Sequence, residues 1–477
     1  MKKLKGLKPE MVFKYFEEIS AIPRGSGNMN GISEYCEKFA AENSLKCIRD
    51  ALNNIIIYKE GSKGYENAQP VILQGHLDMV CQKEPDSRID FEKDGLDIFI
   101  DDDYIKARGT TLGADNGIAV AMVMAILASE DIAHPPIEAL FTTDEETGMF
   151  GATALDGSLF KGKKLINLDS EEQDKLTVSC AGGSEFKMEI PFERKDVSGT
   201  KITISLSGLK GGHSGIEIDK GRVNASILAG RFLNELQRVD LISITGGDKS
   251  NAITNACKIE ILSNSPDETV SVIENYAQIV KKEISDMEPD FEISAVVDGK
   301  GDFEVIDKSA KEKLCFALLF MPNGVQSMSA TIDGLVETSL NLGILKTESD
   351  KITMISALRS NKQSALDALQ SKLKAFAKFI DCPVETSGHY PPWEFKKDSQ
   401  LQQIYKDCFK EKFGYEPTVE AIHAGLECGV LSSKIAGLDA ISIGPDLFDV
   451  HTTKEKLKIS SAKEMFELIL KLLEKMK

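Results

Sequence analysis

Two patterns of hydrophobic and polar residues divide the chain. Up to about residue 190, segments with a helical spacing of apolar residues alternate with short, continuous apolar runs. The helical segments lie near 9–21, 30–43 and 114–129, and the apolar runs near 53–58, 70–76, 137–143 and 163–169. Alternating helices and buried strands predict an α/β domain with a largely parallel sheet. The functional side chains of such a domain are expected at the carboxyl ends of its strands.

From about residue 198 the pattern changes to a repeated order of strand, helix and paired strands. Alternating runs such as KITISLSG and FEISAVV flank helical segments, and VETSLNLGIL and DKITMISALRS read as a hairpin. These patterns predict an α+β domain inserted at 198–388. The Pro-Pro in HYPPWEF favours an extended connector back to the first domain, which we expect to comprise 1–197 and 389–477.

Composition and charge exclude several classes of function. A chain of 477 residues is longer than a single hydrophobic core supports, which agrees with two domains. A net charge of −18 without a long basic run disfavours nucleic acid and anionic membranes as partners. No apolar run is long enough to span a membrane, and the basic start continues into an amphipathic helix unlike a signal peptide. The 9 cysteines are scattered without a CxxC motif, which favours a reducing cytoplasm over disulfides or a cysteine zinc site.

Acidic residues and histidines recur where strands end or helices begin. The buried run VILQGHLDMV ends on His76 and Asp78, which are two apart and therefore leave the same face of an extended chain. The other residues at such boundaries are Asp115 in GTTLGADNG, Glu145 and Glu146 in TTDEETG, Asp169 in INLDSEE and His451 in DVHTT.

Each of these residues has an ordinary structural explanation when it is considered alone. An aspartate at a helix start is commonly an N-cap, and acidic residues after a strand commonly lie in a solvated loop. A buried cluster of carboxylates is costly without a cation, however. Two histidines with three or four carboxylates suit two ions of the zinc class with one bridging carboxylate. The pattern as a whole therefore predicts a two-metal site.

The motifs GHLDMV, GADNG, TTDEETG, NLDSEE and DVHTT, in this order, resemble the ligand motifs of the aminoacylase/carboxypeptidase-type di-zinc metallopeptidases. Within this family they are most similar to the motifs of the bacterial, carnosinase-like dipeptidases that act on aminoacyl-histidine. The resemblance extends over essentially the full chain and includes LKGGHSGIEIDKGRVNA and ETSLNLG. It implies an aminopeptidase-like α/β catalytic domain, with a mostly parallel sheet between helices, and an inserted α+β lid domain at 198–388.

The resemblance also implies a role for each candidate residue. Asp115 would bridge two Zn²⁺ ions, for which Co²⁺ or Mn²⁺ can substitute. His76 and Asp169 would complete one metal site, and Glu146 and His451 the other. Asp78 would orient the imidazole of His76, and Glu145 would be the general base. In the lid, His213 of GGHSG would donate a hydrogen bond to the oxyanion, although a surface turn also explains this histidine. The residues implied to bind the substrate carboxylate are Asn255, Arg359, His423 and Gly425.

The implied activity is the metal-dependent hydrolysis of dipeptides, preferentially Xaa-His including β-alanyl-histidine. A water between two divalent ions has a pKa near 7 and would supply hydroxide, with Glu145 as base. A broader di- or tripeptidase, or an N-acyl amino acid amidohydrolase with the same metals, remains an alternative that shares these ligands. The expected partners are a small dipeptide and a second copy of the chain, bound through the lid, but no nucleic acid or membrane.

Overall fold

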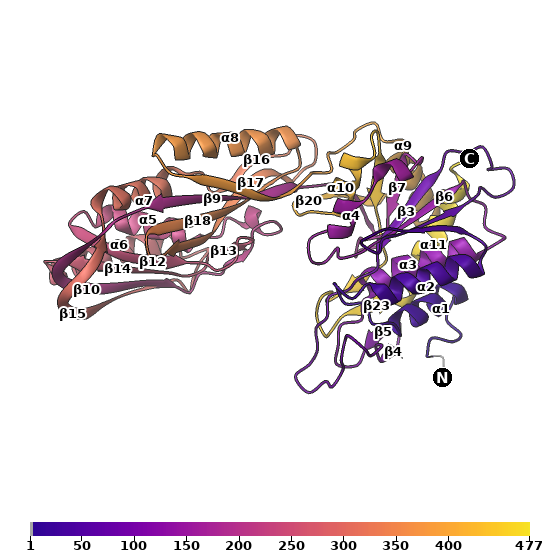
Figure 1. Cartoon of the computed structure of the whole chain (residues 1–477), viewed down its shortest axis with the longest axis horizontal. Coiled ribbons are helices and arrows are strands. Elements are labelled where there is room, and N and C mark those ends of the chain that lie inside the picture. Colours follow the sequence, from indigo (N-terminus) through magenta and orange to yellow (C-terminus); the bar gives the residue numbers. More distant parts are fainter. Residues whose placement is uncertain (1–2) are drawn as a thin grey trace. The chain divides into compact units, whose positions relative to one another are not determined.

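The computed structural model describes residues 3–477, and the chain divides into two compact units. The first unit comprises Met1–Cys180, Phe395–Ala421 and Leu426–Lys477, and the second comprises Ala181–Glu394 and Ile422–Gly425. The second unit is therefore an insertion in the chain of the first, and each is described by itself (Figure 1). Within 3–477, no helix combines the length and hydrophobicity needed to cross a bilayer.

The first unit is built on an eight-stranded mixed sheet. The strands follow the order β1 (Lys46–Arg49), β2 (Ile55–Lys59), β6 (Ile137–Thr142), β3 (Val71–His76), β7 (Lys164–Asn167), β21 (Asp439–Ser442), β8 (Lys175–Cys180) and β20 (Thr418–Ile422). The four central strands, β6, β3, β7 and β21, run parallel to one another. Their carboxyl ends therefore meet at a single edge, where a parallel α/β sheet places its ligands.

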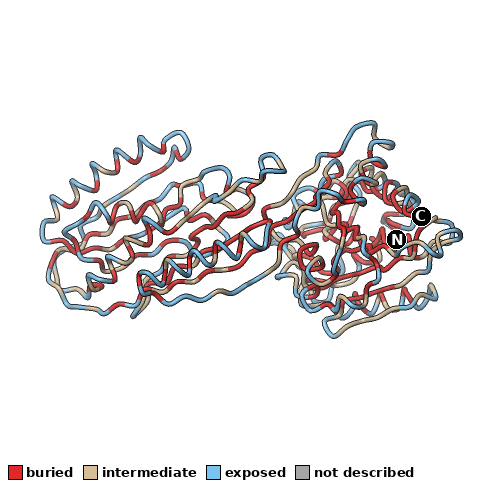
Figure 2. The backbone as a smooth tube through the Cα atoms, turned by 90° about the horizontal axis from the view of Figure 1, so that it is seen from above, coloured by how far each residue is buried: buried red, intermediate tan, exposed pale blue. Residues whose placement is uncertain are grey.

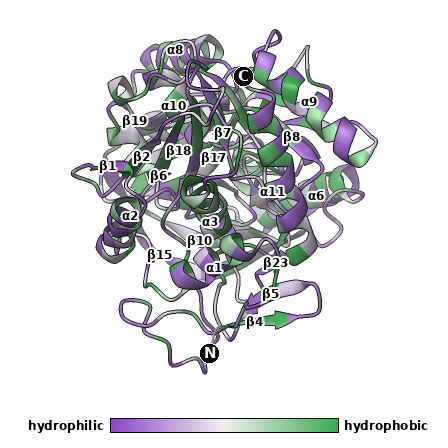
Figure 3. Cartoon of the chain, turned by 90° about the vertical axis from the view of Figure 1, so that its right-hand side faces the viewer, coloured by the Kyte–Doolittle hydropathy of each residue, from purple (hydrophilic) through white to green (hydrophobic). Residues whose placement is uncertain are grey.

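Helices cover both faces of this sheet at its centre. Every residue of β3 and β6 is buried, which explains why these strands are continuous apolar runs without alternation. Figure 3 shows the green, hydrophobic residues along the strands near the labels β6 and β7. The helices of this unit are α1 (Glu10–Ser20), α2 (Asn30–Glu42), α3 (Ala114–Ala128), α4 (Phe150–Ala154), α9 (Gln400–Phe413), α10 (Glu427–Lys434) and α11 (Ile459–Glu474). A small separate sheet has the order β22 (Leu447–Phe448), β23 (Lys456–Lys458), β5 (Tyr104–Ala107) and β4 (Ile98–Asp101).

The second unit is built on a nine-stranded antiparallel sheet. Its strands are β14 (Cys257–Ser263), β10 (Arg194–Ser207), β15 (Glu292–Ile306), β12 (Val239–Gly246), β17 (Val336–Thr347), β18 (Lys351–Ser360), β9 (Gly182–Pro191) and β19 (Val384–Tyr390), with β16 (Gly324–Met328) paired to β17. The helices α5 (Ala225–Glu235), α6 (Pro266–Ile284), α7 (Lys308–Phe320) and α8 (Gln363–Phe379) pack on these strands around one apolar core. Figure 2 shows the buried residues in red along the strands and the exposed residues in blue along the outer helix surfaces.

The predicted fold class is confirmed, with one clear difference in strand length. The runs KITISLSG and FEISAVV predict two short strands, whereas β10 and β15 have 14 and 15 residues and pair along their whole length. Their additional residues, around 194–200 and 298–304, are mostly polar, and all of them except Gly199 are at least partly exposed. Because this part of the strand pair buries little apolar surface, its sequence has no alternation of hydrophobic and polar residues. The sequence pattern therefore does not reveal it.

Candidate metal centre

Three adjacent strands bring the first group of candidate residues to one edge of the sheet. His76 is the last residue of β3, and in the parallel register it lies opposite Thr142, the last residue of β6. Glu145 and Glu146 follow shortly after β6, and Asp169 follows shortly after β7. Residues that are far apart in the sequence thus meet because their strands are parallel neighbours.

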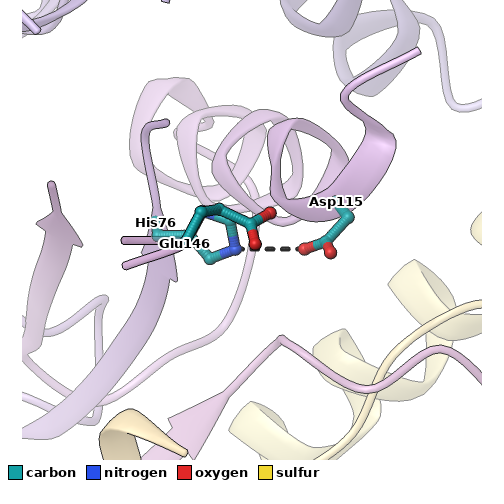
Figure 4. Close-up of side chains that lie close together, drawn as sticks. All are labelled: His76, Asp115 and Glu146. Atoms are coloured by element: carbon teal, nitrogen blue, oxygen red, sulfur yellow. Dashed lines mark hydrogen bonds and ion pairs between the residues drawn. The ribbon is translucent and has the colours of Figure 1, made fainter. Parts of the chain in front are cut away.

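Asp115 and His451 approach this edge from outside the sheet. Asp115 lies in the first turn of α3, and its two carboxylate oxygens face two different imidazoles. Its Oδ1 is 3.0 Å from the Nε2 of His76, and its Oδ2 is 3.1 Å from the Nε2 of His451. Each imidazole also faces a carboxylate of its own. The Nε2 of His76 is 3.4 Å from the Oδ1 of Asp169, and the Nε2 of His451 is 3.0 Å from the Oε1 of Glu146. One carboxylate therefore lies between two pairs that each contain an imidazole and a carboxylate. Figure 4 shows three of these residues, His76, Asp115 and Glu146, with the contact between His76 and Asp115 dashed.

The donor atoms of this cluster fit a divalent cation. Ligand atoms of His76, Asp115 and Glu146 lie within 4.8 Å of one another, and nitrogen and carboxylate oxygen are donors that zinc-class ions accept. Burial, with the nearby Asp115 carboxylate, raises the pKa of Asp169 to about 6. Burial also raises the pKa of Glu145 well above its ordinary range. Neighbouring carboxylates add to both shifts, and a cation at this position would offset that repulsion.

Asp78 connects two parts of this cluster. The Nδ1 of His76 is 3.1 Å from the backbone oxygen of Asp78 and 3.5 Å from its carboxylate. The same carboxylate accepts hydrogen bonds from the backbone amides of Glu145, at 3.0 Å, and Glu146, at 3.2 Å, and from the hydroxyl of Ser26, at 2.8 Å. Asp78 thus lies in contact with His76, as the sequence predicts, and it also holds the turn that carries the two glutamates.

Next to the cluster lies a layer of buried polar side chains that the sequence motifs do not reveal. The carboxylate of Glu427 accepts hydrogen bonds from Gln74, at 2.5 Å, and Thr142, at 2.7 Å, and Gln74 in turn accepts one from Asn167, at 2.5 Å. Gln74 precedes His76 by two residues on β3 and therefore shares its strand face. Asn167 is the last residue of β7 and precedes Asp169 by two residues. The sequence does contain a signal for this layer. Gln74 and Asn167 are polar residues in otherwise apolar strands, and each stands two positions before a candidate ligand.

Two further buried charges, Arg24 and Glu455, were also missed. Arg24 is only 1% exposed and Glu455 is 3% exposed, and both bond to backbone groups near Asp115. Glu455 follows His451 by four residues, a spacing that could have drawn attention to it. For Arg24 in AIPRGSG, the local sequence gives no comparable signal.

The second unit contains the remaining candidates, and His213 lies on its short strand β11 (Gly212–His213), which pairs with β13 (Ala252–Ile253). The Nδ1 of His213 accepts hydrogen bonds from the backbone amides of Gly215 and Ile216, both at 3.2 Å. The neutral imidazole therefore carries its proton on Nε2. Burial and the charge of Arg359 lower the pKa of His213, which favours this neutral form. The side chain is thus a hydrogen-bond donor through Nε2.

Arg359 and His423 lie together in this unit, close to His213. A Cβ atom at Gly215 would be 2.6 Å from the backbone oxygen of His423, 3.0 Å from the ring of His213 and 3.2 Å from the Nε of Arg359. Arg359 is 9% exposed and donates to the hydroxyl of Tyr390 at 2.9 Å. The Nε2 of His423 lies 2.7 Å from the hydroxyl of Ser339, and burial, with the charge of Arg359, lowers the pKa of His423 to about 3.

The two other predicted substrate residues lie at the margins of this group. Asn255 is exposed and lies beside Gly211. Gly425 is half-buried and follows His423 by two residues. The structure thus places His213, Arg359 and His423 around Gly215, and it leaves the roles of Asn255 and Gly425 as predictions.

Comparisons with known proteins identify relatives of this chain. The profile of peptidase family M20/M25/M40 matches residues 72–475. The chain is 36% identical to the cytosol non-specific dipeptidase of Escherichia coli (strain K12) over 481 aligned positions, which cover 99% of each protein.

Solved structures with a similar fold extend this comparison. The crystal structure of aminoacylhistidine dipeptidase from Vibrio alginolyticus is similar with a TM-score of 0.91 and 35% identity, over 99% of this chain and 98% of that one. The aminopeptidase PepT from Bacillus cereus ATCC 10987 has a TM-score of 0.57 at 17% identity, over 98% of this chain and 99% of that one, which indicates a shared fold.

Proposed function

The chain belongs to peptidase family M20/M25/M40, and on this basis we propose that it is a dipeptidase that works with two divalent metal ions held by its first unit. As a member of this family, it is a hydrolase of peptide bonds. The observation that supports the two-metal centre best is the position of the Asp115 carboxylate between the imidazoles of His76 and His451.

In this proposal, His76 and Asp169 hold one ion, Glu146 and His451 hold the other, and Asp115 contacts both. The ions would polarise the scissile carbonyl and lower the pKa of a water molecule towards neutrality. Zinc is the ion we propose, with cobalt or manganese able to substitute. The nitrogen and oxygen donors, without a cysteine among them, suit all three.

Glu145 acts as the general base. It takes a proton from the attacking water and returns it to the amine of the leaving residue. Asp78 supports this role because its carboxylate binds the backbone amides of both Glu145 and Glu146 and so fixes the turn between base and ligand. Burial favours the protonated form of Glu145, and the cations beside it would restore the carboxylate that a base requires.

The second unit supplies groups for the substrate. His213 donates a hydrogen bond from Nε2 to the oxyanion that forms at the scissile carbonyl. The buried guanidinium of Arg359 binds the free carboxylate of the dipeptide, because a guanidinium pairs with a carboxylate through two parallel hydrogen bonds. Asn255, His423 and Gly425 complete the binding of that end.

We propose that dipeptides with C-terminal histidine, including β-alanyl-histidine, are among the substrates. The names of the two relatives point to different ranges, since one is a non-specific dipeptidase and the other an aminoacylhistidine dipeptidase. A broader di- or tripeptidase is therefore the second candidate, and an N-acyl amino acid amidohydrolase is the third.

A substrate panel tests this proposal. Purified protein, reconstituted separately with zinc, cobalt and manganese, is assayed on Xaa-His and other dipeptides, on tripeptides, on N-acyl amino acids and on a long unfolded polypeptide. We expect hydrolysis of dipeptides, with Xaa-His among them. Cleavage only of N-acyl amino acids would favour the amidohydrolase, and efficient cleavage within the long polypeptide would contradict the proposal.

We also propose that the protein is a cytoplasmic homodimer formed through the second unit. Exposed apolar side chains on this unit support an association surface, among them Phe320 at 65%, Phe379 at 80% and Val296 at 55% exposure. A symmetric dimer could place His213 of one chain in the active site of the other. Co-expression of a Glu145→Ala chain with a His213→Ala chain tests this arrangement. Restored activity in purified mixed dimers supports it, and mixed dimers no more active than either parent variant exclude it.

A further inference from the structure

Glu455 binds an unusual number of backbone amides for one side chain. Its Oε2 accepts hydrogen bonds from Leu112, at 2.7 Å, and Gly113, at 3.0 Å. Its Oε1 accepts from Ala114, at 2.8 Å, and lies 3.4 Å from the amide of Asp115. The four successive amides belong to the segment that leads into α3 and ends on Asp115. The carboxylate thus replaces the backbone acceptors that the first turn of a helix lacks.

Arg24 binds the same segment through its carbonyl groups. Its guanidinium donates to the backbone oxygens of Leu77, at 2.9 Å, and Asp78, at 3.1 Å, and to that of Gly113. Leu77 and Asp78 directly follow His76. Arg24 therefore connects the segment after one candidate ligand to the segment before another.

Arg24 and Met79 lie close against the backbone of Gly113. Its φ of 63° is in the left-handed region that favours glycine, and a Cβ atom there would lie 2.5 Å from the Nη2 of Arg24 and 2.6 Å from the Sδ of Met79. Only glycine therefore fits at this position, while Glu455 binds the amides and Arg24 a carbonyl of the same segment.

The chain between His451 and Glu455 is short. His451 has a φ of 63°, and the amide of Glu455 bonds to the carbonyl of Thr452 at 3.2 Å. A tight turn therefore joins the imidazole that faces Asp115 to the carboxylate that holds the backbone of Asp115. A change in the Glu455 contacts would move both His451 and Asp115.

Burial makes this arrangement costly if stability is its only role. Burial raises the pKa of Glu455 and lowers that of Arg24, so each charge is held at some cost. Apolar side chains of similar volume often stabilise an interior as well as a buried ion pair does. Apolar side chains cannot, however, accept hydrogen bonds from the four amides or donate hydrogen bonds to the three carbonyls.

We propose that Glu455 is a positioning residue, which together with Arg24 holds Asp115 and His451 at the separation that the bridged metal centre requires. The inference rests on the proposed two-metal function and adds to it a residue that touches neither substrate nor reacting atoms. Residues that orient metal ligands commonly change metal affinity by about 10- to 100-fold when they are replaced.

The test compares Glu455→Gln with a matched control, Glu138→Gln. Glu138 is also buried, at 4% exposure, and its carboxylate accepts from the backbone amides of Lys161 and Gly162, at 3.0 Å each. It lies on β6 four residues before Thr142, and in the parallel register it pairs with Ile72 rather than with His76. Both substitutions keep the side-chain volume and replace an acceptor oxygen with an amide group.

Three quantities are measured on each protein. They are zinc affinity by competition with a chelator, the thermal midpoint of the metal-free form, and backbone hydrogen exchange in residues 112–118. We expect Glu455→Gln to weaken zinc binding by about 10-fold or more and to speed exchange in 112–118. Glu138→Gln should lower the thermal midpoint with zinc affinity unchanged.

Zinc affinity in Glu455→Gln equal to the parent, or an equal loss in Glu138→Gln, would overturn the proposal. If Glu455→Gln fails to fold, Arg24→Met takes its place, because methionine is of similar length and has no donor for the three carbonyls. Normal zinc affinity in that variant would likewise overturn the proposal. Zinc affinity and exchange do not depend on any substrate. A parent protein that binds zinc but cleaves no peptide would therefore refute the dipeptidase function and leave this inference open to the same comparison.

Discussion

The two units hold their candidate residues in opposite electrostatic settings. In the first unit, the carboxylates of Asp78, Asp115, Glu145, Glu146 and Asp169 surround two imidazoles. In the second unit, the buried guanidinium of Arg359 lies beside two histidines, and burial together with its charge lowers their pKa values. The first setting favours a cation and the second favours an anion. A metal-dependent enzyme that recognises a free carboxylate needs both.

Two residues four positions apart show the contrast most clearly. Burial, with the carboxylates of Asp169 and Asp78, raises the pKa of Glu427 in the first unit to about 8. Burial, with the charge of Arg359, lowers the pKa of His423 in the second unit to about 3. Burial opposes the charged form of each group, and like charges nearby add to this effect. The imidazole of His76 acts in the opposite direction on Glu427, but burial outweighs it.

The largest loss of activity is expected when the neighbouring glutamates of the first unit, Glu145 and Glu146, are replaced, and the two variants should differ because the proposed roles differ. Glu145→Gln should keep its metal and lose roughly 10²-fold or more in kcat, the usual scale for a missing general base. Glu146→Gln should instead lose metal from one site. Elemental analysis and steady-state kinetics on both variants separate the two roles. The reverse pair of results would show that base and ligand are exchanged in our assignment.

A smaller loss of activity is expected when Arg359 of the second unit is replaced. Arg359→Met removes a charge-assisted hydrogen bond, which is worth about 1.5–3 kcal/mol, and should raise KM for dipeptides by roughly 10- to 100-fold. Dipeptide amides, which lack the carboxylate, should be poor substrates for the parent and lose little further in the variant. An equal loss on both kinds of substrate would mean that Arg359 does not bind the carboxylate.

A further prediction concerns the pH dependence of stability, which should differ in sign between the two units. Glu427 has its pKa raised from 4.5 to about 8 in the folded state, so between these values the unfolded chain releases a proton that the folded chain keeps. Its contribution therefore falls as pH rises towards about 8. His423 has its pKa lowered from 6.5 to about 3, so its contribution falls as pH decreases below 6.5.

Denaturant unfolding of metal-free protein from about pH 4 to about pH 8 measures this difference. Relative to the parent, Glu427→Gln should become more stable as pH rises, because glutamine cannot ionise. His423→Gln should become relatively more stable as pH decreases. Parallel curves for a variant and the parent would show that the group titrates alike in folded and unfolded chains.

Much of the fold could be predicted from the sequence, because its central elements bury apolar residues. The predicted strand at 70–76 is β3 (Val71–His76), and the predicted helix at 114–129 is α3 (Ala114–Ala128). Full burial of these elements produces the apolar runs from which they were predicted. The outer halves of β10 and β15 were not predicted, since their stability comes mainly from backbone pairing with each other.

The candidate site could be predicted to a similar extent, and for a related reason. His76 and Asp169 stand at strand ends, where a polar residue after an apolar run is conspicuous. Glu455 and Arg24 act on backbone amides and carbonyls, which every sequence offers. Their partners therefore become visible only once the chain is folded.

The most direct test of the account is to measure metal content and dipeptide hydrolysis on the same samples. Protein stripped by a chelator and shown by elemental analysis to be metal-free is titrated with zinc, and activity is recorded at each step. The account predicts no hydrolysis without metal and full activity at two zinc ions per chain, with Asp115→Ala inactive throughout because the shared ligand is missing. Full activity in the metal-free sample would contradict the account.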